Sequence, residues 1–139
     1  MASFFSKKCE YGLQAVIYLA TKENNKLYSA KEISEELNIP KEFISKILQD
    51  LTDKGMVFSR KGRDGGFKLA VNADEIKLID IIKAVDGLDI FKSCILGFNN
   101  CRKYKKCFLQ DEWSNILNQT YNMLSNETVG NFKEKFLHA

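Results

Sequence analysis

The spacing of apolar residues predicts several short helices and one pair of short strands. Residues 10–21 are apolar almost all round, which is typical of a helix buried on several sides. Ser29 and Glu32 have the spacing of a capping box, which predicts a short helix over residues 30–37. Pro40 suits the first position of a second helix. The apolar stripe of that second helix consists of Phe43, Ile44, Ile47, Leu48 and Leu51. A short helix, a tight turn and a longer helix with a polar face are typical of a helix-turn-helix.

A predicted hairpin follows this pair of helices. Residues 56–59 and residues 67–71, the latter apolar at every second position, predict two strands. The glycine-rich turn between them carries three cations, Arg60, Lys61 and Arg63. Directly after a helix-turn-helix, such a hairpin is typical of the wing of a winged helix. Cations at its tip are then placed to meet DNA phosphates or to enter a minor groove. The alternative is a basic turn that is simply solvated.

The remainder of the chain is predicted to be helical. Apolar residues recur every third position in residues 74–85, which predicts a helix that packs back on the domain. A longer helix is expected from about Leu109 to Ser125, and a last short one begins at Thr128. The stripe of the long helix consists of Trp113, Ile116, Leu117, Tyr121 and Leu124. A long helix with a spare apolar face favours pairing with a second copy of the chain. Folding back on its own domain is the alternative.

These patterns predict a mainly α protein with a small β-hairpin wing (α+β). We expect a winged helix-turn-helix DNA-binding domain at residues 1–87 and a cysteine-bearing loop at 88–108. Residues 109–139 are expected to hold a long C-terminal dimerisation helix and a last helix that packs back on the domain. The net charge of +3 over 139 residues points only weakly to a polyanionic partner.

The N-terminus is too short and polar for a signal peptide, and no apolar run is long enough to span a membrane. These features predict a cytoplasmic protein without a membrane partner, in which thiols stay reduced. The only histidine, His138, lies next to the C-terminus, and no nucleophile lies near a base. We therefore expect no enzymatic activity.

Three of the four cysteines, Cys94, Cys101 and Cys107, lie within fourteen residues. The cations between the last two favour the thiolate, which is the form that binds metals. Structural zinc sites usually use cysteine pairs two to four residues apart, and here the gaps are six and five residues. An iron–sulfur cluster tolerates such irregular spacing. A thiol switch without a metal fits as well. The spacing by itself leaves these alternatives open.

Several stretches together resemble one family of bacterial regulators. These stretches are Glu-Tyr-Gly-Leu-Gln-Ala at 10–15, Ile-Pro-Lys-Glu-Phe-Ile-Ser-Lys-Ile-Leu at 39–48 and Gly-Gly-Phe-Lys-Leu at 65–69. The cysteine triplet and the helix with Trp113 follow in the same order. The chain is similar over nearly its whole length to the winged-helix iron–sulfur transcriptional regulators of the IscR/NsrR family. The resemblance implies a homodimer that binds a palindrome-like operator in double-stranded DNA. It also implies a 2Fe–2S or 4Fe–4S cluster near the dimer interface that controls DNA affinity, although some members carry no cluster.

The resemblance also assigns roles to residues. Gln110 stands where the family has a histidine ligand, three residues after the last cysteine. By analogy with members that use an acid near the N-terminus, we expect Glu10 of one chain to complete the metal site of the other, with Cys9 as a rival ligand. Cys94, Cys101 and Cys107 are the remaining ligands in this assignment.

The DNA-contacting residues implied by the resemblance are Lys41, Ser45 and Lys46 on the second helix of the helix-turn-helix, with Lys61 and Arg63 in the wing. The expected function is therefore a repressor-like regulator that senses iron, redox state or nitric oxide through a cluster. The alternative is a regulator of the same fold controlled by thiol oxidation or by a partner. An iron–sulfur electron carrier is disfavoured because it needs neither a helix-turn-helix nor a wing.

Overall fold

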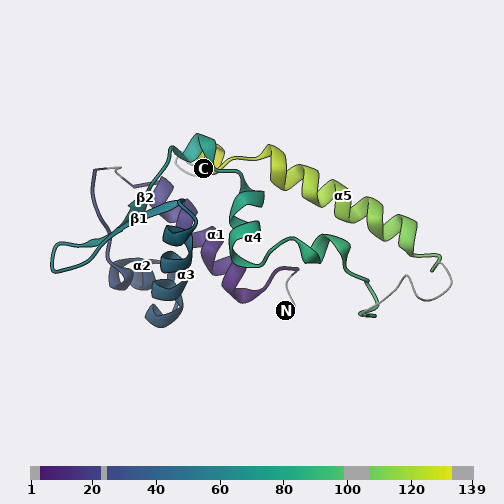
Figure 1. Cartoon of the computed structure of the whole chain (residues 1–139), viewed down its shortest axis with the longest axis horizontal. Helices are drawn as coiled ribbons and strands as arrows, with labels where there is room; N and C mark the ends of the chain where they lie inside the picture. The colour runs from purple at the N-terminus through teal and green to yellow at the C-terminus, as the bar shows by residue number, and fades with distance from the viewer. Residues whose placement is uncertain (1–3, 23–24, 99–106, 133–139) are drawn as a thin grey trace.

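The structure is a computed structural model and describes residues 4–22, 25–98 and 107–132. Helices and one hairpin follow one another along the chain in the predicted order (Figure 1). The elements are α1 Lys7–Ala20, α2 Ala30–Leu37, α3 Lys41–Asp53, β1 Val57–Arg60, β2 Gly66–Leu69, η1 Ala73–Glu75, α4 Leu78–Val85, η2 Asp89–Lys92 and α5 Gln110–Asn126. The predicted mainly α fold with a small hairpin is confirmed.

Helix α1 lies at the centre of the domain and packs against α3 and α4. It begins earlier than its apolar pattern suggests, because the side chain of Ser6 accepts a hydrogen bond from the Cys9 N–H and caps the helix. Gly12 lets α4 approach closely, since an added Cβ would lie 3.1 Å from Cγ2 of Val85. Glu10 is therefore the fourth residue of α1 and lies in its first turn.

The helix-turn-helix forms as predicted. The Ser29 side chain accepts a hydrogen bond from the Glu32 N–H and begins α2, and Asn38 ends it in a left-handed conformation with φ of 56°. Pro40 is the residue before α3 and not its first residue. The stripe Ile44, Ile47, Leu48 and Leu51 is buried in the core. Phe43 was expected in that stripe, and this expectation is wrong, because its side chain is 54% exposed.

The hairpin pairs β1 with β2 in antiparallel register from Val57↔Leu69 to Arg60↔Gly66. The second strand ends earlier than predicted, so Val71 lies outside the sheet and is exposed. Tyr28, just before α2, exchanges two backbone hydrogen bonds with Phe67, at 2.9 and 2.8 Å. These bonds attach the hairpin to the helical part of the domain.

The helix predicted over residues 74–85 is shorter in the structure. Only Leu78–Val85 forms an α-helix, because the residues before it pair with a distant segment. The Val129 N–H donates to the Ile76 carbonyl and the Leu78 N–H donates to the Glu127 carbonyl. Val129 is fully buried. The chain after α5 thus returns to the core, and Phe136 and Leu137 of the predicted last helix lie outside the described residues.

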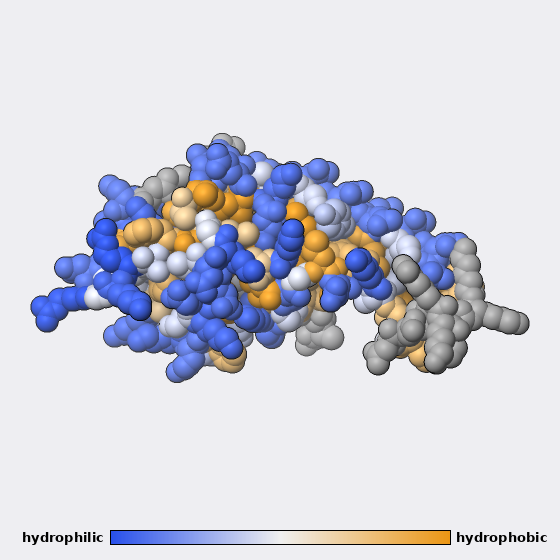
Figure 2. Space-filling view, in the orientation of Figure 1, coloured by the Kyte–Doolittle hydropathy of each residue, from blue (hydrophilic) through white to orange (hydrophobic). Residues whose placement is uncertain are grey.

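Helix α5 has almost the predicted bounds and packs against α4 and η2. Figure 1 shows the hairpin with α2 and α3 at one end of the molecule and α5 at the other, with α4 between them. In the same view, hydrophilic residues cover most of the end that carries the hairpin, and apolar residues reach the surface in the middle (Figure 2). The proposed division into three regions stays a prediction.

Candidate functional site

The polar face of α3 carries the cations expected to meet DNA. Lys41 and Lys46 are exposed, and Ser45 is half-buried at the flank of the helix. Gln49, three residues after Lys46, is exposed on the same face. The sequence analysis did not include Gln49, although its position one turn after Lys46 could have indicated it. A Gln amide can make a bidentate hydrogen-bonded contact with adenine in a major groove.

The tip of the hairpin carries the other three predicted cations. Arg60 is the last residue of β1, Lys61 and Arg63 lie in the turn, and all three are exposed. The turn depends on Gly65, since a Cβ there would overlap the Arg60 carbonyl oxygen. Backbone geometry therefore holds the three cations on a narrow projecting turn.

Two of the three clustered cysteines lie at one pocket. Cys94 follows η2 and Cys107 precedes α5, and both are half-buried in the wall of a pocket of about 930 Å³. Its wall includes Phe91, Trp113 and Leu117, so it combines sulfur ligands with an apolar lining. Cys101 lies outside the described residues, between the two chain segments that form this pocket. The pocket thus brings together two of the three predicted thiolate ligands, whereas an iron–sulfur cluster is held by four ligands.

Contacts with helix α5 hold the segment of chain that leads into the cysteine loop. The Trp113 Nε1–H donates a hydrogen bond of 2.9 Å to the carbonyl oxygen of Ser93, the residue before Cys94. The Phe91 ring packs edge-on against Tyr121 of α5, with ring centroids 5.3 Å apart. Gln110, where a histidine was expected, is the first residue of α5 and lines the pocket. Gln110 therefore lines the same pocket as Cys94 and Cys107.

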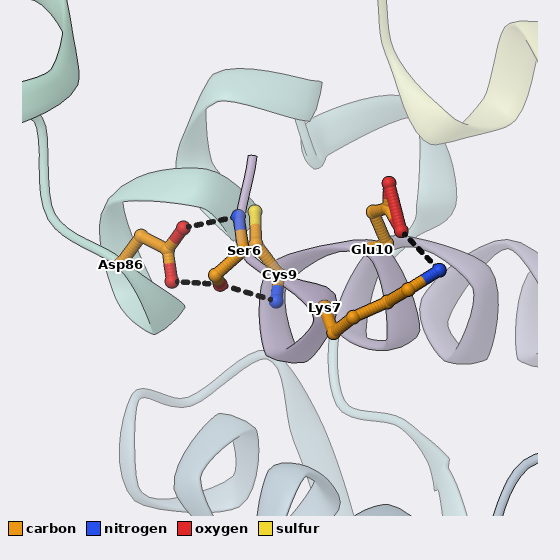
Figure 3. Close-up of polar contacts among 5 residues, drawn as sticks. All are labelled: Ser6, Lys7, Cys9, Glu10 and Asp86. Carbon is orange, nitrogen blue, oxygen red and sulfur yellow. Dashed lines mark hydrogen bonds and ion pairs between the residues drawn. The ribbon is translucent and has the colours of Figure 1, made fainter. Parts of the chain in front are cut away.

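Glu10 and Cys9 have opposite environments at the start of α1 (Figure 3). The Glu10 carboxylate is partly exposed and forms an ion pair of 3.3 Å with Lys7. Cys9 is 0% exposed. Burial, followed by the charges of Asp86 and Glu10 and a hydrogen bond with Asp86, raises the pKa of the Cys9 thiol to about 12. A protonated, buried thiol is a poor metal ligand.

Asp86 holds the start of α1 in place. The Ser6 Oγ–H donates to Asp86 Oδ1 at 2.6 Å, and the Ser6 N–H donates to Oδ2 at 3.3 Å (Figure 3). Asp86 is the residue after α4. On the other side of α1, Lys8 forms an ion pair of 3.1 Å with Asp50 of α3. The first turn of α1 therefore touches both the chain that leads to the cysteine loop and the second helix of the helix-turn-helix.

The single chain does not bring all the predicted metal ligands together. Glu10 is not among the described residues that line the pocket of Cys94 and Cys107. Within residues 4–22, 25–98 and 107–132, no group of three or more His, Cys, Asp or Glu side chains could hold a metal ion. His138, which a zinc site would need, lies outside these ranges.

Comparison with known proteins identifies the family. The sequence profile of Rrf2, an iron-dependent transcriptional regulator, matches residues 5–135. The chain belongs to the Rrf2 family. This membership confirms the resemblance to the IscR/NsrR regulators, and it makes the protein a DNA-binding transcriptional regulator and not an enzyme.

Individual Rrf2 relatives are similar over most of their length. The chain is 30% identical over 138 residues to a predicted HTH-type transcriptional regulator of Aquifex aeolicus, covering 96% of this chain and 95% of the relative. It is 29% identical to NsrR of Oceanobacillus iheyensis, covering 88% and 84% of the two chains. Among solved structures it resembles CymR, the global cysteine regulator of B. subtilis, with a TM-score of 0.77 and 25% identity. That match covers 97% of this chain and 98% of CymR.

These Rrf2 comparisons agree with the winged-helix architecture described above. In the described part of the chain, no helix is long and apolar enough to cross a membrane.

Proposed function

We propose that the protein is a homodimeric regulator whose affinity for its operator depends on an iron–sulfur cluster. Cys94, Cys101 and Cys107 would hold the cluster in one chain, and Glu10 of a second copy would complete the site. The observation that carries the proposal is the shared pocket, because it places the two described cysteines of the triplet in one sheltered wall. Bound there, a cluster supplies an iron-dependent, oxidisable link between the loop and α1.

The DNA side of the proposal uses two groups of residues. Lys41, Ser45 and Lys46 on α3 would face the major groove, as the second helix of a helix-turn-helix does. Arg60, Lys61 and Arg63 would contact phosphates or the minor groove from the wing. The five cations of these two groups are all exposed to solvent. Their exposure supports this assignment, because each can reach a phosphate or a base edge.

Dimerisation would use the exposed side of α5. Ile116 and Met123 are 51% and 57% exposed and lie seven residues apart, so they share one face of the helix. The neighbouring face of α5, about 100° round the helix, is already covered, since Leu117 and Leu124 are buried. A second copy pairing along the exposed side would remove these apolar side chains from water.

The contacts of α1 give a physical route between the two sites. Asp86, which begins the segment leading to the cysteine loop, binds Ser6, and Lys8, two residues after Ser6, binds Asp50 of α3. If Glu10 bound the cluster, its carboxylate would lose or share its ion pair with Lys7, which is 3.3 Å long. Such a change at the first turn of α1 would shift the population of α3 positions. The shift alters operator affinity only if the two states differ in DNA binding.

Anaerobic reconstitution of single variants tests the proposal. Cys94→Ser and Glu10→Ala are expected to lose cluster absorbance and acid-labile sulfide, whereas Cys9→Ala keeps both. Circular dichroism should show the same helix content for Cys94→Ser, Glu10→Ala and the wild type. Operator affinity, measured by gel shift after reconstitution and after cluster removal, is expected to differ in the wild type and in Cys9→Ala, and to stay the same in Cys94→Ser and Glu10→Ala. Full cluster content in Glu10→Ala with loss in Cys9→Ala would reverse the choice of ligand.

The similarity to CymR favours a second candidate, control by a thiol without a cluster. CymR is the global cysteine regulator of B. subtilis, and that role is known for CymR. In this chain, Cys94 and Cys107 line one pocket, and they are the described thiols on which such control would act. Iron-free protein separates the two candidates. An operator affinity that switches between oxidised and reduced iron-free protein would support thiol control and contradict the cluster.

A further inference from the structure

Phe43 is an apolar side chain at the edge of the polar face of α3, one turn before Lys46. It belongs to the first turn of the helix, two residues after Lys41 and three before Lys46. The other large apolar residues of α3, Ile44, Ile47, Leu48 and Leu51, are at most 1% exposed, whereas Phe43 is 54% exposed. About half of the Phe43 ring therefore contributes nothing to the core. An aromatic ring left in water lacks the favourable free energy that its burial would supply.

The covered half of the ring has one aromatic neighbour. The Tyr11 ring of α1 lies with its centroid 6.0 Å from that of Phe43, at an interplanar angle of 59°. This tilted contact is a favourable aromatic geometry. It fixes the direction of the Phe43 ring while its other side stays open. A ring held in place before binding loses less conformational entropy when a partner covers it.

The place of Phe43 in the helix-turn-helix points to the partner that would cover the ring. Lys41, Glu42 and Lys46 are also exposed on this helix, and the chain belongs to a family of DNA-binding regulators. The first residues of the second helix in a helix-turn-helix meet base edges in the major groove. A phenylalanine has no hydrogen-bond donor for phosphates. The apolar group that the major groove offers is the C5-methyl of thymine.

We propose that Phe43 packs against thymine methyl groups in the major groove and selects thymine over cytosine at that position of each operator half-site. Lys46, near the ring on α3, would face the groove beside it. The contact gives Phe43 a part in sequence reading that a lysine cannot supply at a thymine, because a lysine has no apolar end group to pack on the methyl. Tyr11 acts as a positioning residue for the ring.

Deoxyuridine substitution isolates the proposed contact, because uracil lacks only the methyl group of thymine. An operator is first obtained by selection of wild-type protein on random double-stranded DNA, using whichever of the iron-loaded and iron-free forms binds more tightly. Single thymines in each half-site are then replaced by deoxyuridine and affinities are measured by fluorescence anisotropy. Wild type is expected to lose about fourfold in affinity at the contacted thymine, from the burial of one methyl group.

The Phe43→Ala variant should bind the thymine and deoxyuridine operators equally, and Phe43→Leu should keep part of the difference. Phe58→Ala is the matched control, since Phe58 is a 41% exposed phenylalanine on β1 with Lys68 above its ring. It should keep the full sensitivity to deoxyuridine. Thermal unfolding of all three variants is expected to stay close to wild type. Because the readout is a ratio of two operators, it does not depend on whether a cluster is bound.

Two outcomes would overturn the proposal. The first is a set of deoxyuridine substitutions that affect wild type and Phe43→Ala alike at every position. The second is a Phe43→Ala protein that sediments as a monomer while the wild type sediments as a dimer, and whose residual DNA binding still distinguishes thymine from deoxyuridine. That result would assign the exposed ring to contact with a second copy of the chain.

Discussion

Alkylation of Cys9 in the native protein is expected to be about a thousandfold slower than alkylation of an ordinary thiol. The thiolate is the reactive form. The pKa of Cys9 is raised from 9.0 to about 12 by burial first and then by the charges of Asp86 and Glu10. At about pH 8, roughly a tenth of an ordinary thiol is ionised, against roughly one part in ten thousand for Cys9. Its 0% exposure slows the reagent further.

The assay is timed labelling of iron-free, reduced protein with iodoacetamide, followed by mass spectrometry of each cysteine peptide. Cys94 and Cys107, which are half-buried at the pocket, serve as internal references. Unfolded protein gives the intrinsic rate of each thiol. Cys9 labelled at a rate within tenfold of Cys94 in the folded protein would refute the reasoning, and it would restore Cys9 as a possible metal ligand.

Asp86→Asn tests the cause of the shift. Removing the carboxylate charge should lower the pKa of Cys9, and because burial remains, the pKa should stay above its ordinary value. Cys9 labelling should therefore become faster than in the wild type and stay slower than in unfolded protein. The raised pKa also means that folding favours the protonated thiol. Its stabilising contribution is complete below about pH 9 and is lost as the pH rises from about 9 to 12.

Three further variants test the wing, the helix-turn-helix and the dimer. Gly65→Ala would place a Cβ against the Arg60 carbonyl and should weaken operator binding by about 1–3 kcal/mol in gel shifts; unchanged affinity would remove the wing from the interface. Ser29→Ala removes the cap of α2 and should cost about 1 kcal/mol in urea unfolding, with Ser29→Thr as a near-neutral control. Met123→Lys places a charge on the exposed side of α5 and should shift sedimentation toward a monomer with unchanged helix content. A Met123→Lys protein that stays dimeric would mean that α5 pairs through another surface.

The sequence by itself determined the features that depend on neighbours a few residues away. The cap at Ser29, the tight turn between α2 and α3 and, to within one residue, the bounds of α5 follow from local hydrogen bonding and from apolar spacing. The basic turn with Arg60 and Arg63 is equally local. These patterns were sufficient to predict the order of the elements and the winged-helix architecture, because each element buries one face that its own sequence defines.

Only the tertiary structure decided which chemically active side chains are accessible. Cys9 and Glu10 are neighbours in sequence, but the packing of α1 buries the thiol and leaves the carboxylate at the surface. Phe43 has the spacing of a core residue, yet the helices that cover α3 leave its ring half in water. The late start of α4 has the same origin, since Ile76 bonds to Val129, a residue far away in the chain. Periodicity states which residues share a face of a helix, and long-range packing decides how much of that face is covered.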